Sequence, residues 1–188
     1  MLLLGVLGMG VRAPAVQAQE DAQALQVEAA FLVNFVRFTQ WPPDRFNSAN
    51  APYVIAVVGT ADAARTVRTV ADAAGNIQGR DIAVVRVDPA DVEGRQKLAL
   101  DVVRGSHLVF VRSSDGDVRR QVLATVAGTA VLTVGDEPDF AARGGMLGLV
   151  QAGDHLAFEA NPEQIQAAGV QLSAKVLKLA RIRRGRPT

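Results

Sequence analysis

Three acidic side chains follow an apolar run in the segment VLTVGDEPDFAARGGMLGLV, which spans residues 131–150. Asp136, Glu137 and Asp139 supply carboxylate oxygens, the ligands that a hard cation such as Ca²⁺ prefers. Their spacing differs from that of a calcium loop, and no further acidic ligand stands nearby in the sequence. The alternative is that Asp136 or Asp139 caps a turn after a strand, because a carboxylate there accepts hydrogen bonds from free backbone N–H groups. The sequence favours the cap, and we expect no metal site.

A second segment, VVGTADAAR at residues 57–65, joins an expected strand to a helix start through Gly59. The N-terminus of a helix attracts anions, so this junction is the candidate for phosphate binding. A dinucleotide fingerprint needs three spaced glycines, and a P-loop needs Gly-Lys-Ser/Thr. Neither pattern occurs here, which favours an ordinary strand-to-helix turn.

The residues of nucleophilic catalysis do not form a recognisable set. His107 and His155 stand near the starts of separate expected strands, Ser106 is only a sequence neighbour of His107, and no serine occupies a nucleophile elbow. The chain has no cysteine, which excludes thiol catalysis and cysteine-bound zinc. We therefore expect structural histidines, no cofactor and no enzymatic activity.

Apolar runs and helix caps alternate along the chain and predict one α/β domain. The order favours a mostly parallel central sheet flanked by helices, followed by a C-terminal β-hairpin and helix. Asn161 is expected to cap the short helix after the hairpin, with Pro162 at its first position. The expected helices span residues 23–40, 61–74, 93–103, 115–127, 162–168 and 172–182, and the expected strands 53–58, 82–87, 107–111, 130–134, 146–150 and 155–159.

The N-terminus resembles an export signal. Residues 1–18 are apolar up to Val11 and end in small residues, with cleavage expected after Ala18. The apolar part is too short to span a bilayer, so we expect a periplasmic domain over residues 19–188. Residues 1–18 hold one Arg and no acid, which leaves 19 basic and 19 acidic side chains in that domain. A neutral domain is a poor candidate for nucleic-acid binding, which needs a basic surface.

Two surface features leave alternatives open. Trp41 precedes two prolines, so it is either a core residue of the first helix end or an exposed interface anchor. The C-terminal segment SAKVLKLARIRRGRPT carries basic residues that suit a solvated helix end, or that approach anionic lipid or an acidic partner.

Several segments in this order resemble the YfiR family of exported bacterial proteins, also called DUF4154. The most specific are LTVGDEPDFAARGGM, FEAN and AGVQLSAKVLKLA, and the resemblance covers residues 27–182. It implies a periplasmic α/β protein, usually a homodimer, without enzymatic activity, that binds the periplasmic domain of an inner-membrane diguanylate cyclase and represses it. Such repression lowers cyclic di-GMP and biofilm formation. The alternative is a periplasmic small-molecule binder feeding a histidine kinase or an outer-membrane receptor.

Two positions depart from the family pattern. Family members often carry a cysteine where Ser106 stands, so redox control through disulfides is not expected here. Gly148 replaces a larger side chain in an expected strand, which a bulge or a close approach would explain. Besides Trp41, the resemblance leads us to expect a surface pocket that receives a ligand or only holds the fold together. Its polar groups would be Asp136, Glu159, Asn161 and Lys175, and its apolar groups Phe140 and Met146.

Overall fold

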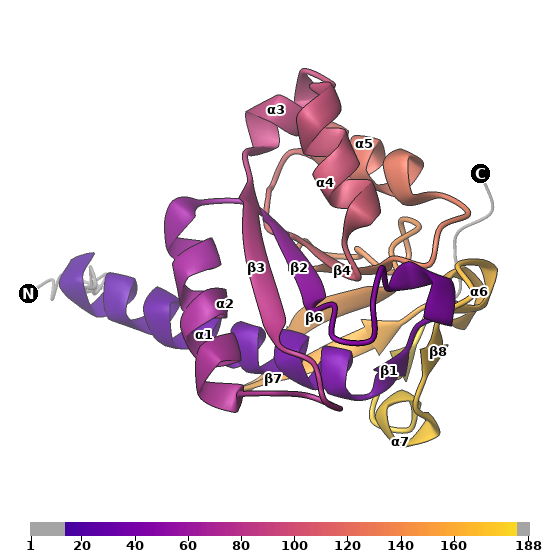
Figure 1. The fold of residues 1–188 in the computed structure, drawn as a ribbon. Helices are drawn as coiled ribbons and strands as arrows, with labels where there is room; N and C mark the ends of the chain where they lie inside the picture. The colour runs from indigo at the N-terminus through magenta and orange to yellow at the C-terminus, as the bar shows by residue number, and fades with distance from the viewer. Residues whose placement is uncertain (1–13, 184–188) are drawn as a thin grey trace, which may run out of the picture.

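The computed structural model describes residues 14–183 and shows a sheet between two layers of helices (Figure 1). The helices are α1 (Pro14–Arg37), α2 (Ala61–Ala74), α3 (Pro89–Glu93), α4 (Lys97–Gly105), α5 (Gly116–Val126), α6 (Pro162–Ala167) and α7 (Ala174–Leu177), with a 3₁₀ turn at Pro43–Arg45. The strands are β1 (Thr39–Gln40), β2 (Tyr53–Val58), β3 (Ile82–Val87), β4 (Leu108–Val111), β5 (Leu132–Gly135), β6 (Leu147–Ala152), β7 (His155–Ala160), β8 (Gln171–Leu172) and β9 (Arg181–Ile182).

The main sheet has the strand order β3-β2-β4-β5-β6-β7-β9. Strands β3 to β6 run parallel, β7 returns antiparallel to β6, and β9 lies parallel to β7. β1 and β8 pair separately as a small antiparallel sheet. The predicted α/β fold with a mostly parallel sheet and a C-terminal hairpin is therefore confirmed.

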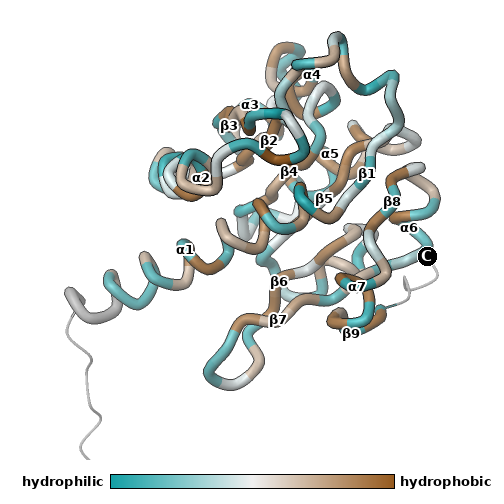
Figure 2. Tube along the Cα trace, turned by 60° about the horizontal axis from the view of Figure 1, so that its bottom comes forward, coloured by the Kyte–Doolittle hydropathy of each residue, from teal (hydrophilic) through white to brown (hydrophobic). Residues whose placement is uncertain are grey.

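The central strands are buried on both faces, which explains their continuous apolar sequences. In β2, Ile55 and Val57 join a cluster that also holds residues of α1 and α2, whereas Ala56 and Val58 join a cluster with α4 and α5. This alternation follows from the two-residue period of a strand. Hydrophobic residues accordingly concentrate in the middle of the sheet (Figure 2).

Helix α1 packs through aromatic side chains predicted to form its core face. Phe35 lies edge-on to Phe158 of β7, with ring centroids 5.2 Å apart, and Phe31 contacts both rings. Leu32 and Val36 have no exposed surface. Val27, expected on the same apolar stripe, remains 42% exposed. The apolar stripe of α1 therefore extends beyond the part that the sheet covers.

Three predicted helices differ in extent from those in the structure; two of these differences follow from pairing with distant strands. The first helix ends at Arg37 rather than at residue 40, because Thr39 pairs with Leu172 across β1 and β8. The helix expected at residues 93–103 is two helices, separated around Arg95, which has a positive φ of 55°. The last helix covers only Ala174–Leu177, since strands β8 and β9 pair on either side of it.

The predicted export signal lies mainly outside the described residues. Residues 14–18 belong to the start of α1, and residues 1–13 are not described. Within residues 14–183, no helix is both long enough and apolar enough to cross a membrane.

An arginine side chain covers part of one edge of the main sheet. β3 is the terminal strand on that side, and the carbonyl of Val84 accepts a hydrogen bond of 2.8 Å from the Arg68 guanidinium of α2. Exposed strand edges invite pairing with other chains, and a charged side chain over the edge discourages it.

Phe140 is held between two glycines in the turn that follows β5. Its side chain is fully buried, and a Cβ placed on either Gly135 or Gly145 would overlap its ring. The turn can lie this close to the end of the sheet only because both positions lack a side chain. The glycines in the segment VGDEPDFAARGG thus have a packing role.

Gly145→Ala should therefore destabilise the fold by about 2 kcal/mol, the usual cost of overpacking a core. Urea unfolding monitored by circular dichroism measures this change. Gly105→Ala is the matched control, because a Cβ there meets nothing within 4 Å. The control should be neutral or slightly stabilising. Equal unfolding midpoints for the two variants would contradict the proposed packing.

Candidate functional site

A polar cleft opens at the carboxyl ends of strands β4 and β5. Its volume is 510 Å³, and it is lined by Arg112, Ser113, Ser114, Asp136, Glu137, Pro138 and Arg143. Strand β3 follows β2 in sequence and pairs with one side of it, whereas β4 pairs with the other side. The order in which successive strands join the sheet therefore reverses between β2 and β4. Open α/β sheets bind ligands beside such a switch point, at the carboxyl edge. The fold alone therefore marks this cleft as a candidate site.

Arg112, the first residue after β4, shares its side chain between two carboxylates. Its Nε lies 3.3 Å from Glu28 Oε2 of α1 and 3.3 Å from Asp136 Oδ2, just beyond β5. Glu28 is buried, and the side chain of Asp136 is 24% exposed. The guanidinium thus connects the first helix to two strands of the sheet. Gly59 at the end of β2 allows the backbone of Arg112 to approach closely, because a Cβ would lie 3.2 Å from the Arg112 carbonyl oxygen.

The two carboxyl groups around Arg112 are harder to ionise than usual. Burial raises the pKa of Glu28, the nearby charge of Asp136 raises it further, and Arg112 opposes both effects. Burial also raises the pKa of Asp136, again opposed by Arg112. The raised pKa values show that one guanidinium does not fully offset the cost of burying both carboxylates. This part of the site therefore has little spare positive charge.

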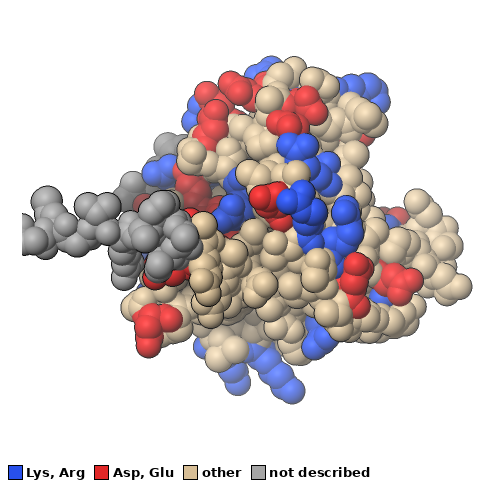
Figure 3. Space-filling view, turned by 90° about the vertical axis from the view of Figure 1, so that its left-hand side faces the viewer, with Lys and Arg blue, Asp and Glu red and all other residues tan. Residues whose placement is uncertain are grey.

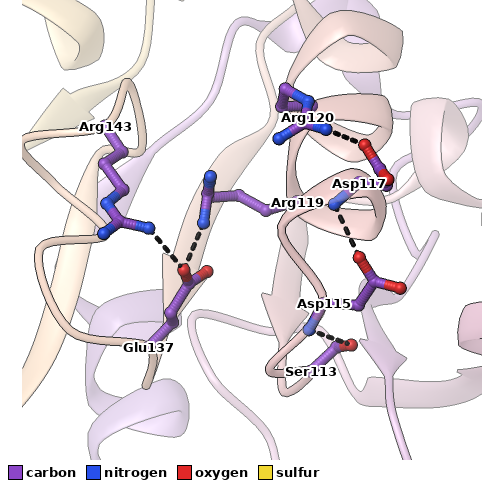
Figure 4. A network of polar contacts seen from close by, with 7 residues as sticks. All are labelled: Ser113, Asp115, Asp117, Arg119, Arg120, Glu137 and Arg143. Atoms are coloured by element: carbon purple, nitrogen blue, oxygen red, sulfur yellow. Dashed lines mark hydrogen bonds and ion pairs between the residues drawn. The ribbon is translucent and has the colours of Figure 1, made fainter.

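Glu137 is the second centre of charge in the cleft (Figure 4). Its Oε1 accepts hydrogen bonds from buried Arg119 of α5 and from Arg143, the latter at 2.9 Å. The adjacent start of α5 is fixed by local bonds, since Asp115 accepts from the backbone N–H of Asp117 at 2.7 Å. Acidic and basic side chains are also interspersed on the face shown in Figure 3.

The cleft does not contain a set of groups for nucleophilic or metal-assisted chemistry. Ser113 and Ser114 are its hydroxyl groups, whereas His107 and His155 lie on other parts of the fold. In residues 14–183, no three His, Cys, Asp or Glu side chains cluster as a metal site would require. What the cleft offers is hydrogen bonding and balanced charge, which suits recognition.

His107 lies at the opposite, amino-terminal edge of β4 within an aromatic cluster. Its Nδ1 accepts a hydrogen bond of 3.0 Å from the Val54 N–H, and its ring stacks on Phe46 with centroids 4.6 Å apart. Burial, helped by the nearby charges of Arg45 and Arg80, lowers the pKa of His107 to about 4. The predicted structural role of this histidine agrees with its burial, whereas His155 is exposed at the hairpin tip.

Trp41 belongs to the same cluster. It is 8% exposed, its Nε1 donates a 3.0 Å hydrogen bond to the His107 carbonyl, and its ring packs against Tyr53. Of the two interpretations of Trp41, this conformation places it in the core. A direct contact between Trp41 and a partner stays a prediction.

The other predicted site residues are spread over several elements. Asp136 lines the cleft, while Met146 lines a separate 430 Å³ hollow between α5 and α6. Buried Glu159 pairs with Arg183 at 2.7 Å, and buried Asn161 caps α6 and donates to the Ala141 carbonyl. Phe140 lies between Gly135 and Gly145, and Lys175 is exposed on α7. Their roles in binding stay predictions.

The arginines that form ion pairs in the cleft were not among the residues predicted from the sequence. Arg112 directly follows a buried strand, which was a usable signal, because residues at strand carboxyl ends meet at one edge of a parallel sheet. Arg143 lies in the acidic segment at residues 131–150. No local pattern pointed to Glu28, which reaches the cluster from a distant helix.

Comparison with protein families gives one match. The family described as YfiR/HmsC-like (DUF4154) matches residues 25–181. No curated protein matches significantly.

A solved structure of the ABC domain in complex with L-Trp, from Streptococcus pneumonia, is similar with a TM-score of 0.51 and 12% identity. The alignment covers 70% of this chain and 56% of that one, so the chain spans just over half of the other protein's length. At this identity, the likeness concerns the fold alone.

Arg112→Met should reduce stability by about 2 kcal/mol, because it leaves the Glu28 and Asp136 carboxylates without their shared cation. Arg112→Lys should restore part of the loss. Arg65→Met is the control, since Arg65 and its partner Asp62 have side chains 67% and 77% exposed. Removing such an exposed pair should cost less than about 1 kcal/mol. Urea unfolding checks all three variants, and equal losses for Arg112→Met and Arg65→Met would contradict the bridging role.

Stability should also depend on the protonation of His107. The pKa of His107 in the folded protein, about 4, lies below the usual histidine value of 6.5. The stability that neutral His107 contributes is therefore complete above pH 6.5 and is lost as the pH falls towards 4. His107→Gln removes this titration, so the difference between wild type and variant should shrink by up to about 3 kcal/mol across that interval. Unfolding at a series of pH values measures it. Parallel pH profiles would contradict the assignment.

Proposed function

The chain belongs to the YfiR/HmsC-like family, and we propose that it binds the periplasmic sensor domain of an inner-membrane diguanylate cyclase and represses it. The family's members are periplasmic regulators rather than enzymes. The observation that carries the proposal is the extent of the match, which runs from Leu25 in α1 to Arg181 in β9. The whole architecture, including both ends of the main sheet, is thus shared with the family.

Repression requires a preference between two states of the partner. A protein that binds the active and the inactive cyclase equally well shifts nothing, however tight the binding. The repressor must therefore contact a surface that differs between these states. A homodimer, which we also propose, would match a dimeric cyclase by symmetry.

Of the seven predicted contact residues, Asp136 and Lys175 have side chains that reach the surface. We retain both as proposed contacts with a partner or a ligand. The other five, Trp41, Phe140, Met146, Glu159 and Asn161, are buried. Any effect of these five on binding would arise through the elements that they hold in place.

A periplasmic small-molecule binder is the second candidate. The polar cleft at the carboxyl ends of β4 and β5, beside the switch point, favours it, since ligand sites in α/β folds occur at that edge of the sheet. The fold is also similar to a domain solved in complex with L-Trp, although function does not follow from fold. In this role the chain would feed a histidine kinase or an outer-membrane receptor. A rise in melting temperature that grows with ligand concentration would support it.

We expect the mature chain, starting at Gln19, to recover a diguanylate cyclase from membrane extract of its own bacterium. Deleting the gene should raise cellular cyclic di-GMP, because the cyclase is then released from repression. A deletion strain whose recovered cyclase also carries an inactivating mutation is the control, and the rise should disappear in it. Unchanged cyclic di-GMP after deletion, with recovery of a kinase or receptor instead, would replace the proposal with the second candidate.

A further inference from the structure

A large groove lies between α1 and the β6–β7 hairpin. We call it the α1–hairpin groove. Its volume is 890 Å³, and it is lined by Glu20, Gln23, Ala24, Val27, Glu28, Gln151, Asp154, His155 and Leu156. All of these residues lie after the expected cleavage at Ala18, so processing leaves the lining complete.

Both walls of the groove extend past the packed layers. The first turns of α1 run out beyond the sheet, and the hairpin tip projects on the same side (Figures 1 and 2). Residues 18–24 are all exposed, and burial of α1 in the core begins at Leu25. Helices in proteins gain most of their stability from packing. These turns of α1 therefore present a helix wall that the rest of the described chain does not cover.

The floor of the groove is apolar. Val27 is 42% exposed and stands beside Ala24 on α1, facing the half-buried Leu156 on the hairpin. Apolar side chains that lie together in a concave surface favour a docking site, and Ala24, Val27 and Leu156 line the same groove. The apolar stripe of α1 thus continues from the core into this groove.

The charges in the groove have one sign. Glu20, Glu28 and Asp154 contribute acidic groups, and none of the lining residues that the structure describes is Lys or Arg. Glu28 is held in place by Arg112 at 3.3 Å, while Asp154 at the hairpin tip is fully exposed beside His155. This differs from the polar cleft, where arginines and acids alternate. The groove is therefore complementary to a ligand that combines apolar surface with positive charge.

We propose that the α1–hairpin groove is the docking site for a basic amphipathic helix of the regulated partner. Such a helix would place its apolar face on Val27 and Leu156 and its Lys or Arg side chains beside the fully exposed Asp154. Complementary charge of this kind speeds association and selects the partner. The inference rests on the proposed function, because it names the surface through which the cyclase would be held.

The test uses the purified periplasmic domain of the cyclase that the wild-type chain recovers. Val27→Lys places a cation on the apolar floor, and Asp154→Lys reverses a charge on the wall. Each should raise the dissociation constant at least about tenfold, the effect of losing a central contact. Wild-type binding should also weaken as salt increases, because exposed charges are screened. Calorimetric titration measures both effects, and thermal melting shows that the variants are folded.

Leu98→Lys and Leu179→Lys are the matched controls. Both residues are exposed hydrophobics, 78% and 77% accessible, and neither lines the groove. The same apolar-to-basic change at these positions should leave binding unchanged.

Four outcomes would overturn the inference. If wild type and both groove variants bind equally, the groove is not the docking site, although the proposed function stands. If the controls lose binding as well, the effect is one of overall charge. If the groove variants only abolish self-association, the occupant is a second copy of the chain. Failure of the wild-type chain to recover any cyclase overturns the proposed function together with this surface.

Discussion

One guanidinium fixes the relation between the first helix and the sheet. Arg112 follows β4 directly, so its position is set by the strand, and it reaches Glu28 on α1 and Asp136 after β5. Burying either carboxylate in its charged form costs free energy, as the raised pKa values of Glu28 and Asp136 show. Removing the cation would leave both costs uncompensated. Together with the packing of Phe31 and Phe35 on Phe158, this contact holds α1 against the sheet.

The arginine also separates two concave surfaces with different chemistry. On one side, the polar cleft alternates arginine with acid, and its charges are largely satisfied within the chain. On the other side, the α1–hairpin groove carries acids and an apolar floor. Glu28 belongs to the wall of the groove and to the Arg112 cluster at once. The two surfaces therefore share the Arg112–Glu28 ion pair.

The sequence predicted the fold where local signals decide the structure. β2, α2 and β3 agree with their expected bounds, because apolar runs, the Thr60 cap and a glycine stop are all local. It failed where distant segments pair: Thr39 leaves the helix to meet Leu172, and β9 replaces the end of the expected last helix. The site shows the same limit. Asp136 was expected in a pocket because of the family resemblance, but Glu28 and Arg112 are far apart in sequence and only the tertiary fold brings them together.

The covered edge of the sheet constrains how copies of this chain could assemble. Arg68 donates a hydrogen bond to the Val84 carbonyl, an acceptor that a neighbouring strand would need. Extending the sheet across β3 would therefore break this hydrogen bond and displace a cation. At the far end, β9 has only two residues, which is a short template for another strand. Continuous intermolecular sheets, the route to domain swapping and fibres, are therefore discouraged at both ends. This arrangement gives the chain a barrier against ordered aggregation and leaves its helices and loops as the surfaces for reversible assembly.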